Sequence, residues 1–110
     1  MPHIRARGLA LEELELVSDL LIEQLAVAMN TPANEFTLEY TPVTYFAVGG
    51  AAPAYPFFEI LWFDRGAEVK AKVATIIDDL IRPQVEPGLD VTVLFHDLKG
   101  ADYFENKQHF

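Results

Sequence analysis

Hydrophobic positions in the first part of the chain change from the spacing of a strand to that of a helix and back. Residues 3–8 alternate apolar and polar side chains, residues 11–30 repeat apolar side chains at helical spacing, and residues 36–41 alternate again. Pro32 follows the helical segment and would end it. The pattern predicts a β-α-β unit.

The second part of the chain repeats this order. Residues 57–63 form a near-continuous apolar run that is typical of a buried strand, and Asp64 after it is a candidate N-cap for a helix that Pro83 stops. Residues 91–95 alternate as a fourth strand. Residues 47–56, rich in Gly and Pro, are interpreted as a tight connection between the two units. The apolar stripe expected on the helix consists of Val69, Val73, Ile76, Ile77, Leu80 and Ile81.

The two units also match in position. Equivalent residues lie about 54 to 58 positions apart, a spacing that an internal duplication would leave. The matching pairs are Pro2 with Pro56, Pro32 with Pro87, and Tyr45-Phe46 with Tyr103-Phe104. We therefore expect one domain over residues 1–110, with pseudo-repeats 2–46 and 56–104.

Right-handed crossovers would make the strands of each unit parallel. The predicted fold is an α/β (α+β sandwich) domain: a four-stranded sheet with two helices on one face. The other face would be bare, and such a face is covered by another subunit or meets water. Its residues would include His3, Arg5, Arg7, Thr37, Glu39, Glu59, Thr92 and Leu94.

The composition of the chain excludes or disfavours several classes of function. The chain has 110 residues and a formal net charge of −9, which disfavours nucleic-acid and anionic-membrane partners. It lacks cysteine, which excludes disulfides and a cysteine nucleophile. The apolar region 14–29 is interrupted by acidic residues, so it is no membrane span, and no signal-peptide pattern precedes it. We expect a soluble, cytoplasmic protein.

Three features together resemble the tautomerase superfamily, which includes 4-oxalocrotonate tautomerase and macrophage migration inhibitory factor. They are Met1-Pro2 directly before a strand, the double β-α-β order, and Tyr45-Phe46-Ala47-Val48-Gly49-Gly50, similar to the family's aromatic-x-x-Gly-Gly turn. The ends PHIRARG and YFENKQHF look more specifically like an uncharacterised bacterial family within that superfamily.

The resemblance implies a homotrimer whose active sites lie between subunits. It also implies that the amine of Pro2, freed by removal of Met1, is the catalytic base. The expected reaction is keto-enol tautomerisation of a small 2-oxo acid, without a cofactor. The chain departs from the pattern, because Thr37 and Thr92 stand where dicarboxylate tautomerases have an arginine. The alternative function is therefore a non-enzymatic trimeric scaffold or interaction module.

Candidate site residues follow from these considerations. Pro2 is the catalytic candidate; the alternative is a proline that merely opens a strand. Arg5 and Arg7 would bind a carboxylate or, as we favour, form interfacial ion pairs with Glu39 and Glu59. The histidines lack the spacing of metal ligands, so no metal site is expected. We expect the substrate-binding residues to be His3, Arg5, Phe63, Thr92, Tyr103 and Phe104.

Overall fold

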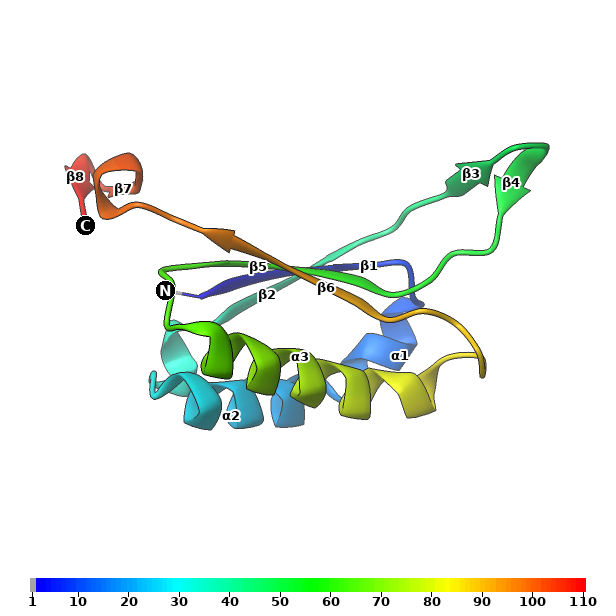
Figure 1. The fold of residues 1–110 in the computed structure, drawn as a ribbon, viewed down its shortest axis with the longest axis horizontal. Helices are drawn as coiled ribbons and strands as arrows, with labels where there is room; N and C mark the ends of the chain where they lie inside the picture. The colour runs from blue at the N-terminus through cyan, green and yellow to red at the C-terminus, as the bar shows by residue number, and fades with distance from the viewer. Residues whose placement is uncertain (1) are drawn as a thin grey trace.

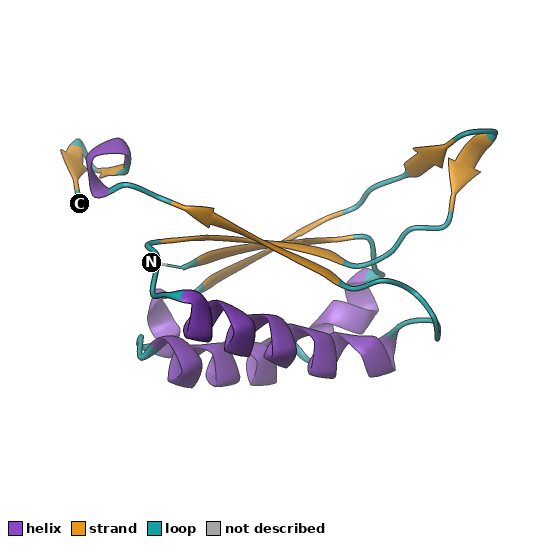
Figure 2. Ribbon diagram, in the orientation of Figure 1, coloured by secondary structure: helices purple, strands orange, loops and turns teal. Residues whose placement is uncertain are grey.

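A computed structural model describes residues 2–110. Met1, whose removal the resemblance implies, lies outside the described residues. The sheet has the strand order β2-β1-β5-β6, with β1 parallel to β2, β5 parallel to β6, and β1 antiparallel to β5. Helices cover one face (Figures 1 and 2). The main elements are β1 (His3–Arg7), α1 (Leu11–Glu15), α2 (Ser18–Met29), β2 (Thr37–Thr41), β5 (Phe57–Trp62), α3 (Ala67–Ile81) and β6 (Thr92–Asp97).

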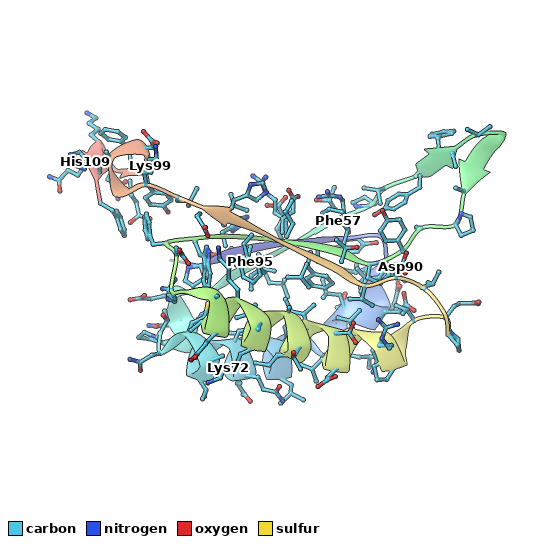
Figure 3. The ribbon with its side chains drawn as sticks, in the orientation of Figure 1. Phe57, Lys72, Asp90, Phe95, Lys99 and His109 are labelled. Carbon is cyan, nitrogen blue, oxygen red and sulfur yellow. The ribbon has the colours of Figure 1, made fainter. Side chains whose placement is uncertain are left out.

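The core lies between the sheet and the helices, as the two periodicities predicted. Alternate residues of the central strands face it, and these include Ile4 and Ala6 of β1. Figure 3 shows Phe95 of β6 in the same layer, where it packs against Trp62 with ring centroids 4.9 Å apart. The fully buried residues of this layer are Ile4, Ala6, Leu21, Leu25, Phe58, Ile60, Trp62, Val73, Ile77 and Ile81.

The two β-α-β units are alike at the residue level. The Pro2 and Pro56 rings are both fully buried. The Pro2 carbonyl accepts a hydrogen bond from the Thr37 amide at 3.2 Å, and the Pro56 carbonyl accepts one from the Thr92 amide at 3.0 Å. Each proline therefore anchors the start of its own parallel strand pair.

The helical prediction for residues 11–30 was wrong in one respect, because the segment forms two helices. The break lies at Val17, whose backbone has φ −119° and ψ −1°. The Val17 amide donates a hydrogen bond to the carbonyl of Leu14, three residues back instead of the four of an α-helix. In this tighter turn the side chains of Leu14 and Val17 are both buried, whereas Leu16 is 76% exposed. The apolar period could not reveal this change of direction.

Asp64 does not cap α3, contrary to the prediction. The helix begins at Ala67 after Gly66, whose φ of 95° favours glycine. The Asp64 carboxylate accepts a hydrogen bond from the Gly66 amide at 2.8 Å, so Asp64 shapes the turn before the helix. The helix ends at Ile81, and Pro83 lies in a following 3-10 turn, η2 (Arg82–Gln84).

Two arms rise from opposite ends of the sheet, on the side away from the helices (Figure 1). A hairpin of β3 (Tyr45–Ala47) and β4 (Gly50–Ala52) begins in the first predicted unit and continues into the segment 47–56 predicted as a tight connection, with Phe46 and Val48 exposed. The second arm is the C-terminal tail, with η3 (Gly100–Asp102), β7 (Phe104–Glu105) and β8 (Gln108–His109); a further 3-10 turn, η1 (Ala33–Glu35), precedes β2.

No helix within residues 2–110 has the length and apolar character needed to span a membrane.

Candidate functional site

A pocket of about 330 Å³ opens at the end of the sheet where β1 begins. It lies between the sheet, η1 and the C-terminal arm, so segments from both ends of the chain form its wall. Its lining residues are Pro2, His3, Glu35, Thr37, Leu61, Leu98, Tyr103 and Glu105. The pocket thus brings together three of the predicted site residues, Pro2, His3 and Tyr103.

Pro2 is held rigidly at the floor of this pocket. Its ring is fully buried, and its carbonyl is tied to the Thr37 amide of the neighbouring strand. His3 is the next residue, and its Nε2 lies 2.8 Å from a carboxylate oxygen of Glu39. The position of the chain around Pro2 is therefore fixed by the sheet and not by a flexible loop.

The open face of the sheet carries a network of charged residues. Glu39 contacts both His3 and, at 3.7 Å from Nε, Arg5. Glu59 pairs with Arg7 and, at 2.8 Å, with His96 Nε2. Arg5 and Arg7 do pair with Glu39 and Glu59, and these ion pairs form within one chain, on the sheet face that the sequence predicted to be bare.

These contacts shift the ionisation of the two carboxyl groups. The hydrogen bond from Arg7, followed by that from His96, lowers the pKa of Glu59. The contact with His3 lowers the pKa of Glu39 in the same way. Both side chains are therefore carboxylates at neutral pH, and each balances two cationic or ionisable neighbours.

An aromatic cluster holds the C-terminal arm over the pocket. Phe63 meets Tyr103 edge-on at 5.7 Å between ring centroids, and it stacks on Phe110 at 5.5 Å. The Phe110 amide also donates to the Tyr103 carbonyl at 3.1 Å. Burial, and then the charge of Glu105, raise the pKa of Tyr103, so its hydroxyl stays protonated at neutral pH.

The remaining predicted site residues lie outside the pocket of the single chain. Arg5 lies against Glu39, and the Phe63 ring packs edge-on against the Tyr103 ring. Phe104 is 62% exposed and contacts the His109 ring. Thr92 pairs with Phe57, at the end of the sheet opposite to the His3–Leu61 pair.

Sequence reasoning missed five of the described lining residues, Glu35, Thr37, Leu61, Leu98 and Glu105. Strand alternation places Leu61 on the face of His3, and that signal was available. Glu35 and Glu105 lie in a 3-10 turn and a two-residue strand, where no period marks the direction of a side chain.

A larger but shallower hollow of about 770 Å³ lies between α2 and α3 on the outer face of the helices. It includes Leu20, Val27 and Lys72, the last of which is labelled on this face in Figure 3. It lies on the far side of the helical layer from Pro2 and contains no histidine or tyrosine. The smaller pocket at Pro2 therefore has the chemically more useful set of residues.

Comparison with known proteins places the chain among proteins of this architecture. Residues 1–109 match a family described as a domain of unknown function, DUF1904. A DUF1904 protein from Sebaldella termitidis has a crystal structure that is similar over 100% of both chains, with 34% identity and a TM-score of 0.92. No curated protein matches the sequence.

More distant structures share the fold. A fused 4-OT, solved as an asymmetric trimer, is 19% identical with a TM-score of 0.79, over 97% of this chain and 94% of that one. A protein crystallised after inactivation by 2-oxo-3-pentynoate is 14% identical with a TM-score of 0.77, over 98% and 94%. The predicted tautomerase-superfamily fold is confirmed by these likenesses.

Proposed function

The chain belongs to the DUF1904 family, and from this premise we propose that it is a homotrimeric tautomerase with the free amine of Pro2 as its base. The observation that carries the proposal is the position of Pro2. It opens β1 in a tautomerase fold, and its buried ring forms part of a pocket that also contains His3 and Tyr103.

The proposed chemistry is proton transfer α to a carbonyl group. The neutral amine takes a proton from the carbon next to the carbonyl, an N–H bond forms, and the C–H electron pair becomes that of an enolate. The resulting ammonium group returns the proton to the enolate oxygen, giving the enol. An α-amine titrates close to neutral pH, so a useful fraction is neutral there. Tyr103 keeps its proton, and by turning its hydroxyl away from Glu105 it would donate a hydrogen bond to the developing oxyanion.

The trimer is supported by the surfaces that the single chain leaves uncovered. The sheet face opposite the helices carries the network of His3, Arg5 and Arg7 with its carboxylates, and Leu94 is 43% exposed there. Both arms project on this side, with Phe46 75% and Phe104 62% exposed. A second and a third copy would cover these surfaces. In such an assembly Thr92 and Phe104 would reach a neighbour's pocket. Residues 1–110 would act as one domain.

A non-enzymatic scaffold remains the alternative because the carboxylate-binding set of known tautomerases is missing. Thr37 and Thr92 stand at the arginine positions, and Arg5 and Arg7 are engaged by carboxylates.

The test compares tautomerase rates of two proline variants. Pro2→Ala should lower kcat/KM for enolisation of phenylpyruvate and of its methyl ester about 10²-fold, the low end for a lost general base. Pro56→Ala is the matched control, because Pro56 is equally buried and makes the equivalent carbonyl contact in the second unit. Equal rates in the two variants, or no rate in any protein, would favour the scaffold.

A further inference from the structure

We infer that the Pro2 pocket takes a carbonyl compound that carries no carboxylate, and not the 2-oxo acids that the superfamily resemblance suggests. The inference rests on the proposed function and names its substrate class. It follows from the charges that line the pocket and from the contacts that the chain's arginines make.

The lining of the pocket is acidic. The described residues that line it include Glu35 and Glu105, and none of these described residues is Lys or Arg. Glu105 lies close enough to Tyr103 to contribute to the raised pKa of the phenol. An anionic substrate entering this pocket would approach the carboxylate of Glu105, and no described Lys or Arg lines the pocket.

The arginines of the open face are engaged elsewhere. Arg5 lies 3.7 Å from Glu39, and Arg7 is hydrogen-bonded to Glu59 while its guanidinium lies over the Phe57 ring at 4.4 Å. To clamp a substrate carboxylate, either arginine would have to leave a carboxylate that it already neutralises. The two lysines of the tail, Lys99 and Lys107, do not line the pocket, and Figure 3 shows Lys99 on the C-terminal arm.

The negative charge in the pocket weakens the binding of anions relative to neutral compounds. One like charge roughly 6 Å away, at an effective dielectric constant of about 40, weakens binding of an anion about tenfold. A neutral ketone or keto ester avoids this penalty and keeps the groups that the chemistry needs, namely the amine of Pro2 and the hydroxyl of Tyr103. The pocket therefore discriminates by charge, in favour of the neutral compound.

The test is covalent labelling with a matched pair of alkynyl ketones, 2-oxo-3-pentynoate and its methyl ester. A neutral amine adds through nitrogen to the alkyne carbon β to the ketone, and the proton lost from nitrogen ends on the α carbon, so all atoms are retained. Protein beginning at Pro2 is incubated with each compound, and intact mass and peptide mapping follow the adduct on Pro2. Each rate is divided by that of prolinamide in solution, which removes the difference in intrinsic reactivity.

We expect the normalised rate for the ester to exceed that for the acid by about tenfold or more. Glu105→Gln should raise the ratio of acid labelling to ester labelling roughly threefold to tenfold over that of the parent protein. Glu23→Gln on α2 removes the same charge far from the pocket and should change neither rate.

The outcomes separate this inference from the proposed function. Faster normalised labelling by the acid, or an unchanged acid-to-ester ratio in Glu105→Gln, would overturn the substrate class while leaving Pro2 as a reactive base. Labelling of Pro2 no faster than prolinamide by either compound would overturn the proposed function together with the inference.

Discussion

The ring of Phe63 meets the ring of Tyr103 edge-on, with 5.7 Å between their centroids. Phe63 follows directly after β5, whereas Tyr103 belongs to the C-terminal arm. This contact joins the arm to the sheet beside the pocket that contains Pro2. The arm is consequently a wall of the site and not a free tail.

Removal of this contact should loosen the arm. Phe63→Ala deletes two aromatic contacts, with Tyr103 and Phe110, and should lower the free energy of unfolding by about 1 to 3 kcal/mol. Urea denaturation measures the loss, and limited proteolysis should cut the arm sooner. Phe104→Ala is the control within the arm, because Phe104 is 62% exposed and lies outside this cluster. Equal effects of the two changes would contradict this role of Phe63.

Gly8 should tolerate a side chain far less well than Gly88. Both have positive φ, +84° and +86°, so an alanine is strained at either position at a cost of about 1 kcal/mol. A Cβ on Gly8 would also come within 1.8 Å of the Tyr55 carbonyl oxygen, whereas one on Gly88 meets nothing within 4 Å. Thermal unfolding should therefore show a much larger loss for Gly8→Ala than for Gly88→Ala. Equal losses would mean that the Tyr55 backbone moves freely.

Stability should fall in acid through Glu59. Because its folded-state pKa lies below the ordinary value of 4.5, Glu59 stabilises the fold above that pH, and the contribution is lost as pH falls further through the folded pKa. Urea midpoints measured from pH 7 to pH 3 should show a shallower acid decline in Glu59→Gln than in the parent. The urea midpoint of Glu23→Gln should fall with pH as that of the parent does. A Glu59→Gln curve parallel to the parent's would refute the stabilising role of Glu59.

The C-terminal arm should also stabilise the assembly. Light scattering at micromolar concentration should give the mass of a trimer for the full chain, and deletion of residues 100–110 should shift the equilibrium towards smaller species. The physical reason is that the arm carries exposed Phe104 and projects from the open side of the sheet. A monodisperse monomer of the full chain would refute the trimer. Unchanged assembly after the deletion would refute the role of the arm.

The sequence predicted the elements whose residues repeat with a fixed period. Alternation of Ile4 and Ala6 with charged neighbours defined β1, and the helical spacing of Val73, Ile77 and Ile81 defined α3. Burial of an apolar face imposes these periods directly, so the order of the elements along the chain and their layering could be derived from them.

The pocket could be predicted only in part. His3 begins β1 and Pro2 directly precedes it, so strand alternation could place both, whereas Glu105 belongs to an arm whose path depends on the packing of Phe110 against Phe63. Such contacts join segments far apart in the sequence and leave no local period. The break at Val17 was missed for a related reason, since a tightened turn preserves the apolar spacing on both sides of it.

The most direct test of the account concerns the amine of Pro2. A cleavable fusion can release the same chain beginning either at Pro2 or with one additional residue before it, which converts the amine to an amide. Enolisation of phenylpyruvate methyl ester is then followed by ultraviolet absorbance from pH 5 to pH 9. The account predicts that the protein beginning at Pro2 is about 10²-fold faster, with a rate that rises with pH as the amine loses its proton. Equal rates for the two proteins would contradict it.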